Sequence, residues 1–305
     1  MIRIPAAALL LSLPAAPLFA QAKLPELPRL MQPRAVMSIP AAAPTESIRY
    51  GEAPSQQVEL FLPRAAQADG RHPVVVMVHG GCWRKDVAGP ELLRPAAAAF
   101  LEKGFAVWSI GYRRVDEEGG GYPGTYQDVA QAIDLLREHA EARQLDLTRT
   151  VLFGHSAGGH LALWAAGRSK LPAASPLRVD NPLKPRGVVS VGGFGSLKKW
   201  QGEIGINCGP DIVQKLAPGD GDARFADTSP EQLLPSGVRT ILLHGVFDGV
   251  ASPATGLDHA QDARRAGDLA EIQIAPVAGH FDVIAPGTAA FAQALAAVER
   301  LSNSR

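Results

Sequence analysis

Short apolar segments rich in β-branched and aromatic residues recur along the chain, separated by more polar stretches. The segments PVVVMVH, FAVWSIGY and RTVLF are nearly unbroken apolar runs. Runs of this length are typical of strands that are buried on both faces of a sheet. The segment QVELFL alternates instead, which indicates an earlier strand. The whole pattern predicts strands at residues 57–62, 73–79, 105–112, 149–153, 186–193, 238–245 and 271–277.

Helical segments separate most of these strands. We predict them at about 90–103, after residue 125, directly after Ser156, and at 288–301. The second has a clear 3.6-residue period, carried by Val129, Ala132, Ile133, Leu136 and Ala140. Thr125 and Asp128 have the spacing of a capping box at its start. The alternation of strands and helices predicts an α/β fold, with a mostly parallel central sheet and helices on both faces.

Two stretches break this alternation. Residues 23–46 are rich in Pro and Ala, and we expect them to wrap loosely over the surface. Residues 195–237 contain Trp200, Cys208 and several glycines, and insertions of this length in a compact domain tend to be functional. We interpret them as a small irregular cap over the carboxyl edge of the sheet, within one domain formed by residues 47–305. A long surface loop is the alternative interpretation.

The first 22 residues have the features of a secretory signal. Arg3 supplies a basic start, an apolar stretch follows, and residues 20–22 (AQA) form a small-x-small cleavage site. A membrane anchor is the alternative, but Pro14 and Pro17 interrupt the apolar run, which is also short for a membrane span. We therefore expect residues 1–22 to be a cleaved signal peptide. The mature chain would be periplasmic or secreted, without stable membrane insertion.

Charge and cysteine content narrow the function classes. The 30 basic and 30 acidic side chains cancel, and no basic stripe is visible, which argues against nucleic acid or anionic lipid as a partner. Cys82 and Cys208 have neither C-x-x-C nor zinc-ligand spacing, so we expect no metal site. In an oxidising compartment the two cysteines can form one disulfide. Two free, buried thiols agree equally well with the sequence.

The segment GHSAGGH, at residues 154–160, contains the pattern G-x-S-x-G around Ser156. The pattern alone occurs by chance in many chains. Here a predicted buried strand precedes the serine and a helical segment follows it, which is the context of a nucleophile elbow. A serine hydroxyl is a poor nucleophile at neutral pH, so it also needs a base, an acid that orients the base, and hydrogen-bond donors for an oxyanion.

An acid and a base candidate follow the serine in the order that such a site requires. Asp248 comes just after the predicted strand at 238–245, and His280 just after the one at 271–277. Functional residues of open α/β sheets gather at this carboxyl edge. We therefore predict Ser156, Asp248 and His280 as nucleophile, acid and base.

Four other side chains are weaker candidates. Asp282 lies so close to His280 along the chain that it would struggle to point at the ring. His155 and His160 flank the serine on a tight turn and cannot easily aim back at its hydroxyl, so we interpret them as packing residues. His259 falls in a predicted helix, and we expect it to be exposed.

Oxyanion donors are expected from two places. One is the backbone N–H of Ala157, directly after the nucleophile, and the other is the loop after an early strand. The segment HGGCW, at residues 79–83, is such a loop, and its glycines allow close approach to a substrate. We predict the N–H groups of Gly81, Cys82 and Ala157 as the donors.

Taken together, these motifs resemble those of the α/β-hydrolase superfamily. The HGG-x-W form resembles its esterase/lipase branch, which includes feruloyl-esterase-like proteins and kynurenine formamidases, and YGEAPSQQVELFLP (residues 50–63) is similar to the lead-in strands of that branch. The resemblance covers about residues 47–301. A cysteine stands at the variable position of HGG-x-W, where the branch often has an aromatic residue. Residues 195–237 match no one subfamily, so the motifs say little about the substrate.

The resemblance implies a serine hydrolase that cleaves small or aromatic carboxylic esters through an acyl-enzyme, without a cofactor. The signal-like start of the sequence adds the expectation that it is exported. An arylformamidase would use the same residues on an amide, although export fits it poorly. A serine peptidase would need a large extra N-terminal domain, and a non-catalytic binding protein would lack part of the triad. Given export, we also hypothesise that a disulfide between Cys82 and Cys208 ties residues 195–237 to the oxyanion loop.

Overall fold

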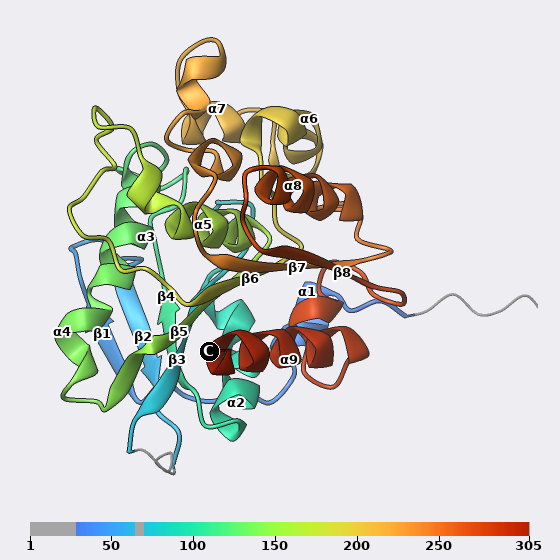
Figure 1. Ribbon diagram of the computed structural model, residues 1–305. Helices are drawn as coiled ribbons and strands as arrows, with labels where there is room; N and C mark the ends of the chain where they lie inside the picture. Colours follow the sequence, from blue (N-terminus) through green and yellow to red (C-terminus); the bar gives the residue numbers. More distant parts are fainter. Residues whose placement is uncertain (1–28, 65–69, 305) are drawn as a thin grey trace, which may run out of the picture.

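A computed structural model describes residues 29–64 and 70–304, which form a twisted sheet with helices on both faces (Figure 1). The order of the strands is β1-β2-β4-β3-β5-β6-β7-β8. The pairs from β4 through β8 are parallel, whereas β2 is antiparallel to β1 and to β4. The strands are β1 (Glu46–Arg49), β2 (Gln57–Phe61), β3 (His72–Val78), β4 (Ala106–Ile110), β5 (Leu145–His155), β6 (Gly187–Val191), β7 (Arg239–Gly245) and β8 (Ala270–Ala275). The predicted α/β fold with a mostly parallel sheet is confirmed.

The apolar strands separate two hydrophobic cores. In β3, Val74, Val76 and Val78 face one core, and Val75 and Met77 face the other. Because alternate side chains of a strand point to opposite faces, a strand that is covered on both faces needs an unbroken apolar run. The sequence pattern therefore reflects the two layers of helices directly.

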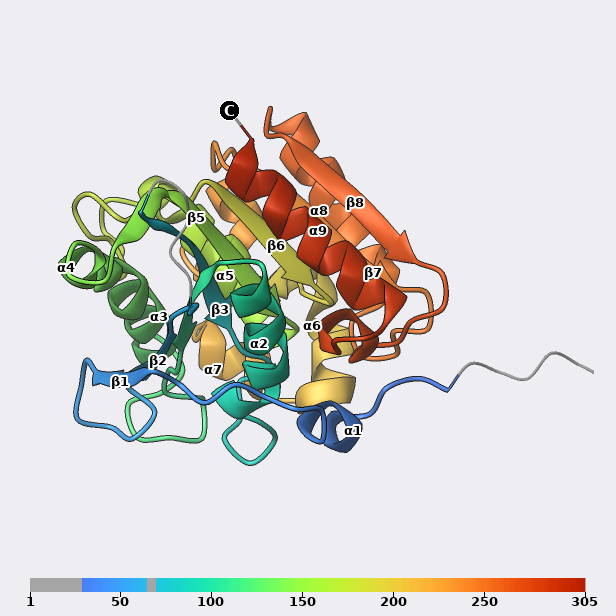
Figure 2. The ribbon, with the colours of Figure 1, turned by 90° about the horizontal axis from the view of Figure 1, so that it is seen from below.

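The helices divide between these two faces. The first core includes residues of α3, α4, α5, α6, α7 and α8, and the second includes residues of α1, α2 and α9. Helix α9 packs across β5, β6 and β7, as the view from below shows (Figure 2). The helices are α1 (Pro33–Met37), α2 (Arg94–Glu102), α3 (Gly124–Asp134), α4 (Leu136–Ala140), α5 (Ala157–Ala166), α6 (Leu197–Cys208), α7 (Ile212–Leu216), α8 (Pro253–Arg265) and α9 (Ala289–Asn303). No helix in the described residues is long and apolar enough to cross a membrane.

The predicted capping box at the start of α3 is wrong. The helix begins at Gly124, two residues earlier than a box with Thr125 as its N-cap requires. The hydroxyl of Thr125 donates to the carbonyl of Arg113 and accepts from the N–H of Gly121. Asp128 instead forms an ion pair with Arg113. Both side chains therefore fix the loop before α3 rather than the first turn of the helix itself.

The stretches that break the pattern are more ordered than expected. Residues 195–237, which we call the cap segment, contain α6, α7 and short 3-10 helices at Asp222–Phe225 and Pro230–Leu233. In the N-terminal stretch, α1 buries Val36 against the second core. The predicted signal peptide at 1–22 lies outside the described residues.

The cap segment reaches the carboxyl end of the sheet. Asn207 of α6 donates to the carbonyl of Val250, in the loop after β7. Cys208, at the end of α6, is joined by a disulfide to Cys82, in the loop after β3. The hypothesised disulfide is therefore present, and the alternative of two free thiols is excluded.

Candidate active site

Ser156 occupies a sharp turn between β5 and α5. Its backbone has φ 55° and ψ −120°, which a residue with a side chain adopts only under strain. The Ser156 N–H donates to the carbonyl of Val191, in the neighbouring strand β6, at 2.9 Å. This geometry is that of a nucleophile elbow, with the side chain at the carboxyl edge of the sheet.

The glycines around Ser156 are required by close backbone packing. A Cβ atom on Gly154 would lie 2.2 Å from the carbonyl oxygen of Gly158, and one on Gly158 would lie 2.0 Å from that of Val78. Both distances are far inside van der Waals contact with atoms that cannot rotate away. The G-x-S-x-G pattern thus lets α5 begin directly against β5 and the end of β3.

Asp248 and His280 form a buried pair. Nδ1 of His280 donates to Oδ2 of Asp248 at 2.8 Å, since a carboxylate can only accept. The other oxygen, Oδ1, accepts from the N–H groups of Val250 and Ala251 at 2.9 and 2.8 Å. Burial by itself raises the pKa of Asp248, but the bonds from His280 and these N–H groups outweigh it, and the pKa is lowered. The carboxylate stays ionised, and because Nδ1 of His280 donates to it, Nε2 is the ring nitrogen that is left to accept a proton.

Gly192 and His155, which neighbour the elbow of Ser156, also lie against this pair. Val191, which accepts from the Ser156 N–H, is followed by Gly192, and a Cβ there would lie 3.0 Å from His280 Nδ1 and 3.1 Å from Asp248 Oδ2. The Nε2 of His155 donates to the carbonyl of His280 at 3.0 Å, and the two rings are 4.6 Å apart.

In the described structure the hydroxyl of Ser156 makes no hydrogen bond. The hydrogen bond between a nucleophilic hydroxyl and its base is often long in a free enzyme and tightens only when substrate is bound.

The predicted oxyanion loop lies against the elbow. A Cβ on Gly80 would lie 3.0 Å from the Cβ of Ser156. The next three residues all have positive φ, 110° at Gly81, 55° at Cys82 and 54° at Trp83. Within the described residues the N–H groups of Gly81, Cys82 and Ala157 donate to no protein atom. They are therefore available to a ligand oxygen, as their predicted role requires.

The other histidines near the serine are buried and neutral. Burial, together with repulsion from His280, lowers the pKa of His155 to about 3. Burial lowers the pKa of His160 to about 3 as well, and its Nδ1 donates to the carbonyl of Phe194. The expectation that His259 is exposed is wrong: it is 4% exposed. The cause is the loop after β6, where a Cβ on Gly195 would lie 2.3 Å from the ring.

Asp282 and Gly192 shape the loops around the Asp248–His280 pair. Asp282 does not contact the His280 ring; its Oδ2 accepts from the N–H groups of Gly279 and Met31. Sequence reasoning missed Gly192, whose lack of a side chain makes room for His280 and Asp248. The signal was available in the sequence, because the predicted strand at 186–193 ends in two glycines, Gly192 and Gly193. No cluster of three or more possible metal ligands occurs in the described residues.

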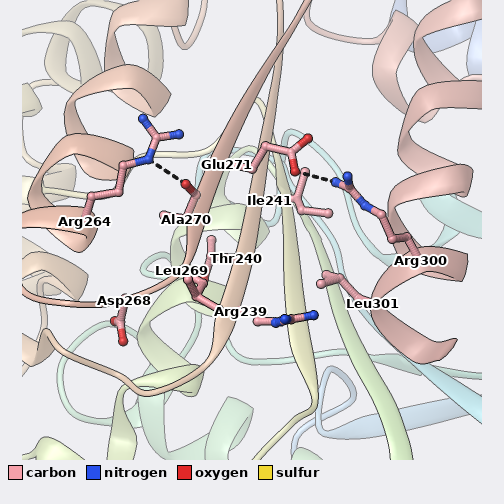
Figure 3. A pocket seen from close by; sticks show the side chains of 10 residues that line it. All are labelled: Arg239, Thr240, Ile241, Arg264, Asp268, Leu269, Ala270, Glu271, Arg300 and Leu301. Carbon is pink, nitrogen blue, oxygen red and sulfur yellow. Dashed lines mark hydrogen bonds and ion pairs between the residues drawn. The ribbon is translucent and has the colours of Figure 1, made fainter. Parts of the chain in front are cut away.

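Four cavities in the described part of the chain are not lined by Ser156, Asp248 or His280. One of about 380 Å³ is lined by the first residues of β7 and β8, Arg239 and Ala270, so it lies at the opposite end of the sheet from Asp248 and His280 (Figure 3). Its arginines are partly engaged, Arg300 with Glu271 and Arg264 with the carbonyl of Ala270. Three further cavities of about 250, 590 and 800 Å³ do not include the serine either.

Known proteins are similar to this chain in sequence and in fold. The BD-FAE family model matches residues 58–200. An isoprenylcysteine α-carbonyl methylesterase of Arabidopsis thaliana is 34% identical over 120 residues, 39% of this chain and 26% of that protein. Esterase LipQ of Mycobacterium tuberculosis is 32% identical over 136 residues, 44% and 32% of the two chains. The chain thus spans about a quarter to a third of the length of these relatives.

Solved structures match over most of the chain. Esterase B from Lactobacillus rhamnosis superposes with a TM-score of 0.72 at 21% identity, covering 86% of this chain and 88% of that one. A truncated carbohydrate esterase from gut microbiota gives a TM-score of 0.69 at 22% identity, covering 87% and 98%. The chain therefore has the α/β-hydrolase fold, and its residues 58–200 match the BD-FAE family.

Proposed function

We propose that the protein is a serine hydrolase of carboxylic esters. The observation that carries the proposal concerns Gly192, which follows Val191, the residue bonded to the strained elbow of Ser156, and lies against the buried Asp248–His280 pair. The similarity to proteins named as esterases supports the same reaction class. Ser156 and His280 are only 3% and 7% exposed, which favours small acyl groups or flat aromatic ones.

The geometry supports acyl transfer in two steps. His280 Nε2 takes the proton of the Ser156 hydroxyl as Oγ bonds to the carbonyl carbon. The former carbonyl oxygen becomes an oxyanion, which the N–H groups of Gly81, Cys82 and Ala157 stabilise. When this intermediate collapses, the bond to the leaving oxygen breaks and His280 returns its proton to the alcohol.

Hydrolysis of the acyl-enzyme repeats these roles with water. Nε2 of His280 takes a proton from water while the water oxygen attacks the acyl carbon. The second oxyanion collapses, the acid leaves, and the proton returns to Oγ of Ser156. Through both steps Asp248 accepts from Nδ1, which keeps the proton on that nitrogen and stabilises the charged ring. The chain's own groups thus account for every proton in the cycle.

Export is part of the proposal. Stable disulfides are rare in the reducing cytosol and common outside it. The bond between Cys82 and Cys208 therefore supports a periplasmic or secreted protein, as does the signal-like start of the sequence. Mass spectrometry of the mature N-terminus from the native host tests this: cleavage after Ala22 is expected, and a retained Met1 in a cytosolic fraction would contradict it.

Hydrolysis of a series of p-nitrophenyl esters from acetate to decanoate, with methyl ferulate and N-formylkynurenine, tests the activity. We expect ester turnover that is highest for short acyl chains and is lost in Ser156→Ala. Ser109→Ala is a matched control, because Ser109 has a buried hydroxyl without a partner in the described structure and lies in β4. Faster turnover of N-formylkynurenine would favour the amidase alternative, and turnover that survives Ser156→Ala would refute the assigned nucleophile.

A further inference from the structure

Cys82 belongs both to the oxyanion loop and to a covalent cross-link. Its backbone N–H is one of the proposed oxyanion donors, and its side chain is bonded to Cys208 at the end of α6 in the cap segment. The two Cα atoms are 5.1 Å apart, although 126 positions separate the residues in the sequence. The cap segment is thus bonded to the loop that would bind the oxyanion.

The backbone of the oxyanion loop is held in an unfavourable conformation. Glycine adopts positive φ freely, so Gly81 at 110° needs no support. Cys82 and Trp83 have side chains, and their φ values of 55° and 54° lie in a region that such residues rarely occupy. Without restraint, these two residues would relax toward negative φ and turn the neighbouring N–H groups away. Contacts outside their own backbone must hold them.

The neighbours of Cys82 have conventional anchors, but Cys82 itself does not. The carbonyl of Gly81 accepts from Arg84, and the carbonyl of Trp83 accepts from Val115. The ring of Trp83 is fully buried. The backbone of Cys82 makes no hydrogen bond within the described residues, and its side chain is half-buried. The disulfide is the connection that holds it.

The other end of the cross-link is firmly placed. Besides the bond from Asn207 to the loop after β7, a carboxylate oxygen of Glu203 accepts from the N–H of Ser252 at 2.7 Å. Ile204 is buried in the first core. Helix α6 is therefore fixed against the loop that carries Asp248, and Cys208 offers Cys82 a rigid attachment point.

We propose that Cys208 is a positioning residue for the oxyanion hole. Through the disulfide it keeps Cys82 at positive φ, so that the N–H groups of Gly81 and Cys82 stay directed at the oxyanion next to Ser156. This inference rests on the proposed ester hydrolysis and adds a role for the cap segment in it. The disulfide acts on the transition state, in which the oxyanion forms, more than on substrate binding.

The test compares Cys208→Ala and Cys82→Ala, which keep every backbone N–H, with wild type. Removing one oxyanion donor costs about 10²- to 10³-fold in kcat. A loop that is released but still samples the competent state should lose less, about 10- to 100-fold. We expect this loss in kcat with little change in KM, and a matching rise in Ki for a trifluoromethyl ketone, whose adduct carries the oxyanion. Ile206→Ala, on the same helix but with an 85% exposed side chain, should behave as wild type.

Reduction provides the same comparison without mutation. Dithiothreitol is oxidised to its cyclic disulfide, and Cys82 and Cys208 each gain a hydrogen. Wild type that folded with the bond intact should lose activity on reduction and regain it on reoxidation, while the double alanine variant should be insensitive to the reagent. The reduction experiment still tests the inference if one of the single variants fails to fold.

Hydrogen exchange distinguishes failure of this inference from failure of the proposed function. Faster exchange of the Arg84 amide, whose N–H donates to the carbonyl of Gly81 in the oxyanion loop, is expected in Cys208→Ala whether or not the ester panel contains a substrate. An inactive wild type with this change would overturn the proposed activity but support the positioning role. An active wild type whose kcat, Ki and exchange are all unchanged in Cys208→Ala would overturn the inference.

Discussion

Replacing Asp248 by Asn should disable His280 while leaving its surroundings in place. The side chain of Asp248 is held at both oxygens: Oδ1 accepts from two backbone N–H groups, of Val250 and Ala251, and Oδ2 accepts from His280. An amide has one accepting and one donating end. Because two donors face the first position, the amide oxygen of the variant must take it. The NH₂ group then faces Nδ1 of His280.

This orientation reverses the tautomer of the imidazole. Nδ1 must now accept, so the proton of a neutral His280 moves to Nε2, the nitrogen that should take the proton from Ser156. In a serine protease of another fold, the same replacement lowers kcat by about 10⁴-fold. A loss of that size corresponds to about 5 kcal/mol of transition-state stabilisation. We expect a similar loss here, since the two N–H groups fix the amide orientation.

Stopped-flow and steady-state hydrolysis of p-nitrophenyl acetate measure this effect. The acyl-enzyme burst should slow with kcat, because both half-reactions need the base. Asp282→Asn is a matched control on the same loop as His280. The Oδ2 atom of Asp282 accepts from the N–H groups of Gly279 and Met31, and the amide oxygen of asparagine can accept the same two bonds. Asp282→Asn should stay within about tenfold of wild type, the size of a small positioning effect. If Asp248→Asn also stays within tenfold, the assigned roles of Asp248 and His280 are wrong.

Three further predictions concern stability and local geometry. Reducing the disulfide should lower the free energy of unfolding by about 5 kcal/mol, because the unfolded chain gains the entropy of an open loop of this length. Guanidinium titrations with and without reductant measure this loss, and an unchanged midpoint would contradict the prediction. Gly192→Ala introduces a Cβ at φ 58° beside His280, which should cost roughly 1 to 2 kcal/mol and lower kcat; full activity would show that the pair has room to move. The pKa of His160 is about 3 in the folded protein and about 6.5 when unfolded. Between these values only the unfolded chain binds the proton, so stability falls as the pH falls through this window. His160→Gln should make that fall shallower by up to about 1.4 kcal/mol per pH unit, as urea midpoints between pH 6.5 and 4 would show.

The strands and the elbow could be predicted from the sequence because their causes are local. A strand that is buried on both faces must be apolar at every position, as in β3. The elbow at Ser156 needs glycines at fixed spacing, because the backbones of α5 and β3 approach so closely. The order of Ser156, Asp248 and His280 follows from the order of strands in a parallel sheet.

Other features depend on tertiary packing and leave a weak local signal. Strand β1 buries only Ile48, so no periodic pattern marks it. Helix α6 includes Gly202 and Gly205, which disfavour a helix in isolation, and the packing of Ile204 and the bond of Cys208 stabilise it. His259 lies on a largely polar helix, and the burial of its ring is decided by the loop after β6, far away in the sequence. The residues of one segment do not reveal its contacts with segments that are distant in the sequence.

The bond between Cys82 and Cys208 also closes a covalent ring around the middle of the chain. Ser156 lies inside the ring, whereas Asp248 and His280 lie outside it. The exposed loop at 171–186, on the surface between α5 and β6, belongs to the ring as well. A protease that cuts this loop once would leave both fragments joined through sulfur, with the nucleophile still attached to its partners. The nicked molecule would run as one chain in a denaturing gel and separate into two only after reduction.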